Sequence, residues 1–507
     1  MANEVIELRG EEVARRIPDG ATIALTGSGV FLEADDLFAA LERAFLETGH
    51  PRGLTLVHAL GIGDGDKSGL NRFAHEGMVA RVIGGHWSWS PTMQRLAREE
   101  KIAAYSFPAG VISTLLREIG ARRPGVITRI GLGTFADPRL DGGRCNNSAT
   151  EDLVELVDFD GVEYLRYKPL KIDVALVRGT EVDRRGNISF QREPTDLDAY
   201  TVALAAHNCG GRVYAQVETR REHRVLPSRL ARLPGVLVDG VFVAPDARKT
   251  YLPGYDPHIA GEATTDYAAR AAAPELPTGI RRIVAERASH EIDGAHSVNF
   301  GYGIPGGIPA LLKARGEATY WGTIEQGIHN GEMLDGPMFG AARDPDAIIP
   351  SIDQFDFYSG GGIDIAFLGM GELDAQGNVN VSVIGGRLVG PGGFVDITQT
   401  AKKVVFCGTF EAKGLEVSEN DGTLNIARYG EVPKLVERVQ HVTFSGEQAR
   451  ANGQEVVYVT ERAVFRLGAE GIELVEVAEG VDLQRDVLER MAFTPHLALA
   501  GPAAAVG

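Results

Sequence analysis

The sequence predicts an open α/β fold that occurs twice in one chain, and three observations support this prediction. The chain has 507 residues, more than one hydrophobic core usually supports, so two domains are expected. Strand-like runs such as GLTLVHAL, KKVVFCGTF and EVVYVTERAVF alternate with amphipathic runs such as ADDLFAALERAFLE and VDLQRDVLERM. This alternation is typical of a sheet covered by helices. The third observation is that the chain resembles itself.

The internal resemblance involves two pairs of segments in the same order. IDVALVRGTEVDRRGNIS (172–189) aligns with IDIAFLGMGELDAQGNVN (363–380), and each reads as a buried strand, a D-x-x-G-N turn and a second strand. Upstream, PDGATIALTGSG (18–29) resembles IDGAHSVNFGYG (292–303). The segment GEATTDYAARAAAPELPTG (261–279) is a natural linker. We therefore predict similar α/β domains at 1–274 and 275–507, fused in tandem.

Composition argues against several classes of partner. The net charge of −18 disfavours nucleic acids and anionic membranes. No apolar run is long enough to span a membrane. The start, MANEVIELRGEEVARRIPDG, fits neither a secretory signal nor a transit peptide, so we expect a cytoplasmic protein. Three widely spaced cysteines, Cys145, Cys209 and Cys407, form neither a disulfide framework nor a CxxC metal motif and are expected to be buried thiols.

The first motif is GYGIPGGIPALL, which begins at Gly301, after the strand-like SVNF and before the helix-like IPALLKA. Glycines in such a turn let backbone amides approach a phosphate at a helix N-terminus. A plain strand-to-helix turn, with Pro305 starting the helix, is the alternative. Glu325 lies at about the spacing of a ribose-binding acid, so dinucleotide binding stays open, although the Gly-x-x-x-Gly loop after Glu325 disfavours it.

The second motif is WGTIEQGIHNG (321–331), which places Glu325 among glycines without a lysine or arginine nearby. The pattern predicts a strand that ends at Glu325 and a turn at Gln326 and Gly327. Ligands of open α/β sheets gather at the carboxyl ends of strands. Glu325 is therefore a candidate catalytic carboxylate, and an ordinary surface carboxylate is the alternative.

The third motif is VGPGGFVDITQTAKKVVFCGTF (389–410), where Gly390, Gly392 and Gly393 precede a strand-like run. Adjacent glycines can turn amide N–H groups toward one point and form an oxyanion hole. A permissive turn is the alternative.

Histidines and tryptophans in two further segments are weaker candidates for site residues. GGHWSWSPTM (84–93) could line a substrate pocket through His86, Trp87 and Trp89, or pack beneath a loop. His329 is expected to be a hydrogen-bonded loop histidine rather than a proton carrier. The pair His75-Glu76 is not an H-E-x-x-H motif, so no metal site is predicted.

The motifs together resemble a known family. TIEQG, VNFGYGIP, FDFYSGGGIDIAFLG, DAQGNVNVS and GPGGFVDITQTAKKVVFCGTF are similar to the second half of family I coenzyme A transferases. GLNRFAHEGMVARVIGGHW, AYSFPAGVISTLLREI and GVITRIGLGTFADPR resemble the acetate and propionate CoA-transferase branch. The resemblance implies two CoA-transferase α/β domains and a homo-oligomer, either a dimer or a tetramer.

The resemblance also implies a mechanism and its residues. It assigns the nucleophile to Glu325, the oxyanion hole to Gly392 and Gly393, and CoA contacts to Gly301, Tyr302, Gly303, Ile304 and Pro305. CoA would pass from an acetyl-CoA or propionyl-CoA type donor to a carboxylic acid, by a ping-pong route through a glutamyl-CoA thioester. CoA would then be substrate and covalent intermediate, without a metal or a permanently bound cofactor.

One departure from the family pattern bears on acyl specificity. The family usually has a small residue or asparagine after the glutamate, followed by glycines, whereas this chain has Gln326 and then Ile328-His329-Asn330-Gly331-Glu332. Two other functions stay open. An acyl-CoA hydrolase on the same scaffold would not require a carboxylate acceptor, and a non-catalytic CoA or dinucleotide-binding protein would not depend on Glu325.

Overall fold

A computed structural model describes residues 4–266 and 275–499. The chain divides into two compact units. The first contains Met1–Thr265, Glu325–Asp356 and Gly385–Asp396, and the second contains Asp266–Ile324, Phe357–Ile384 and Ile397–Gly507. The predicted domain boundary between residues 274 and 275 stays a prediction, because residue 274 lies outside the described residues.

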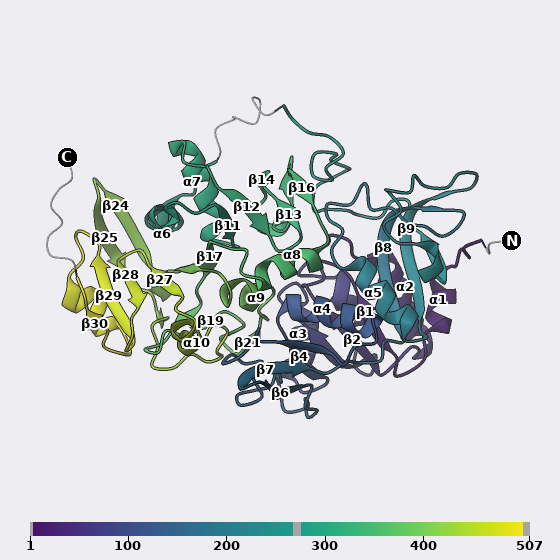
Figure 1. Ribbon diagram of the computed structural model, residues 1–507, viewed down its shortest axis with the longest axis horizontal. Helices are drawn as coiled ribbons and strands as arrows, with labels where there is room; N and C mark the ends of the chain where they lie inside the picture. The colour runs from purple at the N-terminus through teal and green to yellow at the C-terminus, as the bar shows by residue number, and fades with distance from the viewer. Residues whose placement is uncertain (1–3, 267–274, 500–507) are drawn as a thin grey trace. The chain divides into compact units, whose positions relative to one another are not determined.

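The first unit is built on a seven-stranded parallel sheet with the order β10-β9-β8-β1-β2-β3-β4 (Figure 1). The bounds are β1 Thr22–Leu25, β2 Leu54–His58, β3 Val79–Gly84, β4 Ala103–Ser106, β8 Val174–Asp183, β9 Arg212–Arg221 and β10 Gly240–Val243. The chain first builds outward from β1 through β2, β3 and β4, and later adds β8 on the other side of β1. The strand order therefore reverses beside β1, which is where ligands of such sheets bind.

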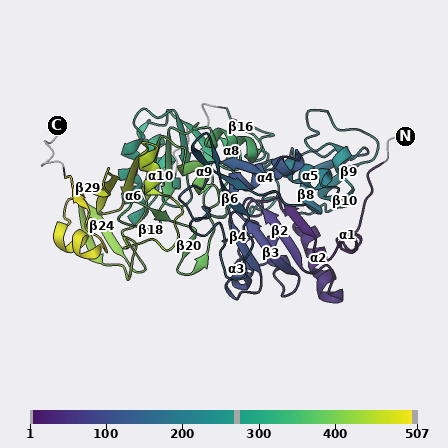
Figure 2. The same cartoon turned by 60° about the horizontal axis from the view of Figure 1, so that its bottom comes forward.

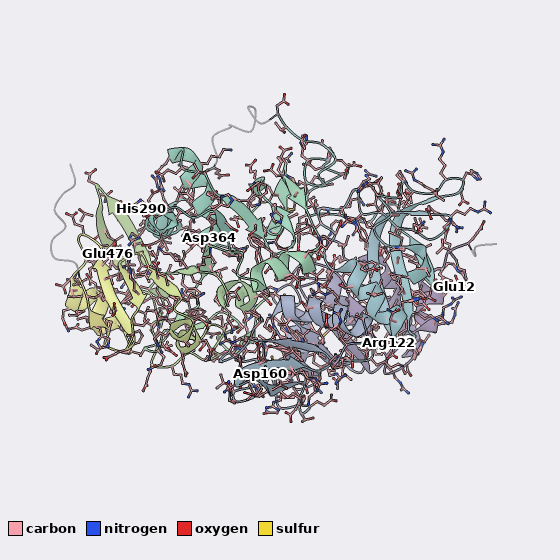
Figure 3. The ribbon with its side chains drawn as sticks, viewed as in Figure 1. Glu12, Arg122, Asp160, His290, Asp364 and Glu476 are labelled. Atoms are coloured by element: carbon pink, nitrogen blue, oxygen red, sulfur yellow. The ribbon has the colours of Figure 1, made fainter. Side chains whose placement is uncertain are left out.

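Helices cover this sheet because their apolar faces pack against its buried strands. They are α1 Gly10–Arg16, α2 Asp35–Thr48, α3 Pro91–Arg98, α4 Ala109–Gly120 and α5 Ala199–Asn208. In α2, Leu37, Phe38 and Leu41 follow the helical period, are buried, and pack in one core with residues of β1 and β2. A separate antiparallel sheet contains β5 Val126–Thr128, β6 Val154–Phe159 and β7 Val162–Tyr167, and Asp160 (Figure 3) turns the chain between β6 and β7.

The second unit has its own parallel strands, in the order β12-β11-β17-β22-β27, followed by β28, β29 and β30. Of these strands, β29 is labelled in Figure 2. The bounds are β11 Ser297–Phe300, β12 Trp321–Ile324, β17 Ile365–Gly369, β22 Lys403–Cys407, β27 Glu455–Val459, β28 Ala463–Leu467, β29 Ile472–Val477 and β30 His496–Leu497. The run KVVFC of β22 is almost continuously buried, as expected for a strand covered on both faces.

Shorter elements complete the two units. The helices are α6 Gly279–Ser289, α7 Ile308–Arg315, α8 Ser351–Ser359, α9 Phe394–Thr398 and α10 Gly446–Ala451. The strands are β13 Ile328–His329, β14 Glu332–Met333, β15 Ala342–Arg343, β16 Ala347–Ile348, β18 Glu372–Leu373, β19 Val379–Asn380, β20 Val383–Ile384, β21 Arg387–Leu388, β23 Glu411–Ala412, β24 Glu416–Asn420, β25 Thr423–Arg428 and β26 Val432–Pro433.

The predicted α/β class is confirmed, and the internal repeat is visible at atomic level. In the first unit, Asp183 accepts hydrogen bonds from the amides of Arg185 and Asn187 at 2.8 and 3.0 Å, and from the Asn187 side chain at 2.9 Å. In the second unit, Asp374 accepts the corresponding bonds from Gln376 and Asn378 at 3.0, 3.0 and 3.1 Å. The repeated D-x-x-G-N sequence therefore forms the same turn twice.

Candidate active site

Glu325 follows directly on β12, so it lies at the carboxyl end of a parallel strand. Two hydrogen bonds and a tight fit at Gly327 fix the turn after it. The Thr195 hydroxyl donates to the Gln326 carbonyl at 2.6 Å, and the Ile349 amide donates to the Gly327 carbonyl at 2.9 Å. Gly327 has φ +90°, and a Cβ there would lie 1.9 Å from the Ile349 carbonyl oxygen. The turn therefore requires glycine at 327 and leaves little freedom to the backbone of Glu325.

Gly393 provides the closest polar contact to the Glu325 carboxylate. Its amide donates to Oε2 at 2.8 Å. A Cβ at position 393 would lie 2.2 Å from the same oxygen and 2.8 Å from the Phe355 ring. A glycine is therefore required for the amide to reach the carboxylate.

The Gly392 amide has a different hydrogen-bond partner from the Gly393 amide. Its amide donates to the Gly85 carbonyl at 2.8 Å, and its carbonyl accepts from the Ala109 amide at 2.9 Å. The Gly392 and Gly393 amides therefore have different partners in this structure, and an oxyanion hole at this glycine pair stays a prediction. Gly392 still lies beside the carboxylate, since a Cβ there would be 3.7 Å from Glu325 Oε1.

The N-terminus of α4 holds the glycine segment in place. Besides the bond from Ala109, the Gly110 amide donates to Asp396 Oδ2 at 3.0 Å. Asp396 is 1% exposed, and burial together with the negative charge of Glu325 raises its pKa to about 8. Sequence reasoning missed Asp396, and the only signal for it was its place three residues after the glycine pair.

The Glu325 carboxylate is partly buried and has a perturbed affinity for protons. Burial raises its pKa to about 7, while hydrogen bonds from the Gly393 amide and the Gln326 side chain act in the opposite direction. No lysine or arginine in the described part of the chain forms an ion pair with it. A desolvated carboxylate that is held by neutral donors and still ionises near pH 7 can act as a nucleophile.

His86, Trp87 and Trp89 occupy different environments. The His86 ring lies near Gly392 and against Gly61, where a Cβ would be 2.4 Å from Nδ1, and the Trp89 ring also borders Gly61. Burial lowers the pKa of His86 to about 4, so the ring is neutral at pH 7. Trp87 is fully buried in the core of the first unit and donates to the Gly84 carbonyl at 3.3 Å. His86 and Trp89 can therefore border the site around Glu325, whereas Trp87 packs in the hydrophobic core of the first unit.

His329 lies on β13, which pairs with β16, and it is half-buried. Burial lowers its pKa, and a hydrogen bond with Gln354 acts in the opposite direction. His329 is therefore hydrogen-bonded, as expected, but it lies on a short strand rather than in a loop.

The predicted CoA loop, Gly301 to Pro305, follows β11 in the second unit. The Gly301 amide donates to the Phe367 carbonyl at 2.8 Å, and a Cβ at 301 would be 2.7 Å from the Leu368 side chain. Tyr302 is 54% exposed, and Gly303 has φ +86°. Pro305 starts a short 3-10 helix that leads into α7. The loop is a strand-to-helix turn in which Tyr302 is exposed while Gly301 and Pro305 are buried, and its CoA contacts stay a prediction.

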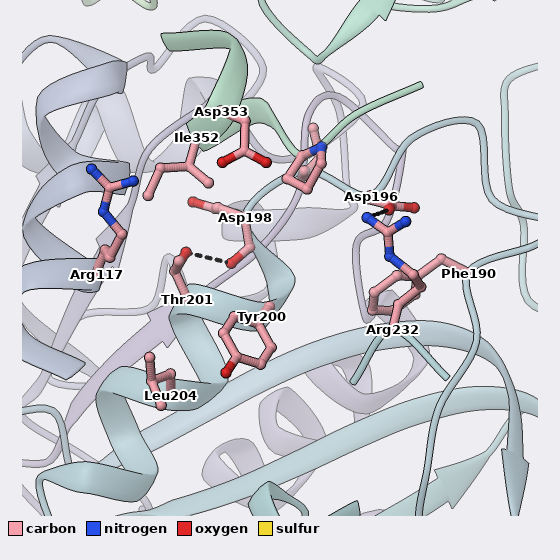
Figure 4. Close-up of a pocket in the computed structure, with 12 residues that line it drawn as sticks. Arg117, Phe190, Asp196, Asp198, Tyr200, Thr201, Leu204, Arg232, Ile352 and Asp353 are labelled. Carbon is pink, nitrogen blue, oxygen red and sulfur yellow. Dashed lines mark hydrogen bonds and ion pairs between the residues drawn. The ribbon is translucent and has the colours of Figure 1, made fainter. Parts of the chain in front are cut away.

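A separate cavity of about 430 Å³ lies in the first unit (Figure 4). It is lined by Arg117, Phe190, Asp196, Leu197, Asp198, Tyr200, Thr201, Leu204, Arg232, Pro350, Ile352 and Asp353. Thr201 donates to the Asp198 carbonyl at 2.8 Å, and burial raises the pKa of the Asp198 carboxyl to about 6. Glu325, Gly392 and Gly393 are not among the lining residues.

Two further features concern residues 4–266 and 275–499 only. Within these ranges no three or more histidine, cysteine, aspartate or glutamate side chains come together as metal ligands would. In the same ranges, every helix is too short or too polar to cross a bilayer.

Comparisons with known proteins agree with the fold and the motifs. The family model for coenzyme A transferase matches residues 7–244. The chain is 42% identical to caffeate CoA-transferase of Acetobacterium woodii, over 97% of this chain and 94% of that one. It is also 42% identical to acetate CoA-transferase YdiF of Escherichia coli strain K12, over 96% and 92% of the two chains.

A solved structure of YdiF from Escherichia coli O157:H7, described as a thioester complex with CoA, superposes with a TM-score of 0.92. It is 39% identical and covers 98% of this chain and 95% of that chain. The resemblance seen in the sequence is confirmed, and the chain is a CoA-transferase enzyme. It belongs to the coenzyme A transferase family, in the branch of the acetate CoA-transferases.

Proposed function

We propose that this enzyme transfers CoA between a short-chain acyl-CoA and a carboxylic acid, with Glu325 as the covalent nucleophile. The observation that carries the proposal is the partly buried Glu325 carboxylate, which accepts the Gly393 amide at 2.8 Å and has no cationic partner among the described residues. The relatives support it, since they are named acetate and caffeate CoA-transferases and one related structure is a thioester complex with CoA.

The chemistry balances without a metal or an external base. Glu325 Oε attacks the acyl-CoA carbonyl, the C–S bond breaks, and an acyl-glutamyl anhydride and CoA thiolate result. The thiolate then attacks the Glu325 carbonyl carbon, and the first carboxylate leaves with the bridging oxygen. A second carboxylate reverses both steps. One difficult exchange is thereby divided into easier ones, which predicts ping-pong kinetics.

The local environment suits each step. Partial burial makes the carboxylate more nucleophilic than it would be in water, and the Gly393 amide keeps a share of it ionised near pH 7. The same amide can stabilise the oxyanion that forms on the glutamyl carbon. The loop from Gly301 to Pro305 is proposed to bind CoA and to supply binding energy for orientation. A cytoplasmic homo-oligomer is proposed with it.

The test compares Glu325→Gln with Glu332→Gln, a matched change at an exposed glutamate of the same segment. CoA transfer from acetyl-CoA to propionate is measured for both. We expect Glu325→Gln to lose at least about 10³-fold in kcat, because removal of a covalent nucleophile leaves only binding and electrostatic contributions. We expect Glu332→Gln to retain activity. Equal activity of the two variants would refute the role of Glu325.

An assay with and without a carboxylate acceptor distinguishes a CoA-transferase from an acyl-CoA hydrolase. When no carboxylate is added, a transferase releases the donor's own acid only up to the enzyme concentration and keeps CoA on Glu325 as the thioester, so free CoA does not accumulate. Continuous CoA release without an acceptor, at the rate seen with propionate, would favour hydrolysis.

A further inference from the structure

The Gln326 side chain lies beside the Glu325 carboxylate and is almost completely buried, with 3% exposure. Its Nε2 donates to the Ser28 hydroxyl oxygen at 3.0 Å and to Glu325 Oε1 at 3.4 Å. The carboxamide lies over Gly340, where a Cβ would be 2.8 Å from Gln326 Cδ. The backbone carbonyl of Gln326 accepts from the Thr195 hydroxyl. The backbone and the side chain of Gln326 are therefore both held by hydrogen bonds.

The orientation of the carboxamide follows from the neighbouring charge. Gln326 Oε1 is buried and has no hydrogen-bond partner in the part of the chain that is described. An unsatisfied buried acceptor costs about 1–3 kcal/mol. The opposite orientation would place this oxygen against the Glu325 anion, which adds repulsion. The amide group is therefore held as a donor toward Glu325.

The two carboxylate oxygens of Glu325 consequently have different partners. Oε2 accepts a short bond from the rigid Gly393 amide, whereas Oε1 accepts a longer one from Gln326. The oxygen with the weaker bond keeps the more available lone pair, so Oε1 is the better nucleophile. Oε2 then remains as the carbonyl oxygen of the glutamyl adduct, where the Gly393 amide faces the oxyanion.

We propose that Gln326 is a catalytic residue that donates to the attacking and leaving oxygen of Glu325. This inference rests on the proposed function. During loading, Oε1 bonds to the acyl carbon and becomes the bridging oxygen of the anhydride. When CoA thiolate attacks the glutamyl carbon, the C–Oε1 bond breaks and its electron pair leaves on the acyl carboxylate. The Gln326 amide stabilises that developing charge.

The proposal predicts a dependence on the leaving acid. A stronger acid leaves as a more stable anion and needs the donor less. We compare single-turnover loading of CoA onto Glu325, followed by mass spectrometry, from acetyl-CoA and from fluoroacetyl-CoA. Gln326→Met keeps a similar length but has no donor, and Gln440→Met, at an exposed glutamine, controls for the type of substitution.

We expect Gln326→Met to slow loading from acetyl-CoA by about 10²-fold, as for loss of an oxyanion donor, and from fluoroacetyl-CoA by clearly less. Gln440→Met should load like the wild type. Equal slowing of both acyl-CoAs would show a merely structural role and overturn the proposal, as would loading at the wild-type rate. Wild type that forms no adduct at Glu325 would instead refute the proposed function.

A second variant keeps the test valid if Gln326→Met does not fold. Gln326→Glu has the same shape but replaces the donor with a second carboxyl group. It should move the midpoint of the pH–loading profile to higher pH, because an adjacent carboxylate disfavours ionisation of Glu325. An unchanged midpoint would contradict the proposal.

Discussion

The loop after β1 and the loop after β11 come from the same repeated motif but have different surroundings. In the first unit, Ser28 is 6% exposed and accepts a hydrogen bond from Gln326, and the adjacent Gly29 amide donates to the Gly61 carbonyl at 2.6 Å. In the second unit, Tyr302 is 54% exposed. The first copy supports the turn that carries Glu325, whereas the second presents side chains to solvent. The two copies share the strand and turn and differ in what the loop contacts.

After the loss of Glu325 itself, the largest effect is expected at the glycine that faces the carboxylate. Gly393→Ala places a methyl group 2.2 Å from Glu325 Oε2 and should lower kcat by about 10² to 10³-fold, as for the loss of an oxyanion donor. Gly303→Ala, in the loop after β11, meets no atom within 4 Å and only strains a residue at φ +86°. Activity assays of both variants should rank them in this order. Equal losses would show that the contact between Gly393 and Glu325 matters no more for activity than the loop after β11.

The next effect concerns the part of the repeat that is the same in both units. Asp183→Ala and Asp374→Ala each remove the acceptor for two amides of a D-x-x-G-N turn. Each change should lower the free energy of unfolding by about 1–3 kcal/mol, because turn amides lose their partner. Thermal or denaturant unfolding measures both. A loss confined to one unit would mean that the turns are alike in geometry but not in energy.

A smaller effect is expected when the pH is changed: the rate of loading CoA onto Glu325 should change about tenfold per pH unit. The raised pKa of Glu325 means that the folded protein binds its proton more tightly than the unfolded chain. The rate should therefore rise about tenfold per unit below pH 7 and level off above it, since only the anion attacks. Stability changes in the opposite direction, because ionisation of the buried group is unfavourable as the pH rises through about 7.

The Glu325→Gln variant is the control for the pH dependence of the free energy of unfolding. Glu325→Gln should gain stability relative to the wild type above pH 7 and differ little below pH 4, where the carboxyl is protonated in both states. Asp396 also has a raised pKa and titrates with Glu325, and it is present in both proteins. A pH-independent loading rate would contradict the assigned ionisation.

The smallest effects are expected from the two loops of the comparison. Ser28→Ala removes a partner of the Gln326 amide and should lower kcat about fivefold, the equivalent of about 1 kcal/mol for one hydrogen bond. Tyr302→Ala, in the proposed CoA loop, should raise KM for CoA more than it lowers kcat. Steady-state kinetics with both substrates separates the two patterns. An identical pattern in both variants would remove the distinction between a supporting loop and a binding loop.

The sequence was sufficient for the fold class and the family, because strand and turn patterns recur locally and survive in both halves. It also placed Glu325 at the end of a strand. It could not show that Gly85 takes the Gly392 amide, or that Thr195, Ser28 and Gln326 meet, because these contacts join residues more than 100 positions apart. Asp396 was missed for the same reason, since its partner Gly110 is 286 residues away.

The chemical fate of Glu325 gives the most direct test of the central claim. The protein is incubated with acetyl-CoA without an acceptor, digested, and analysed by mass spectrometry, with and without borohydride. The account predicts CoA attached at Glu325, its discharge by added acetate, and loss of activity on borohydride reduction only after exposure to acetyl-CoA. Full turnover without any adduct on the peptide that contains Glu325, or inactivation by borohydride regardless of acetyl-CoA, would contradict it.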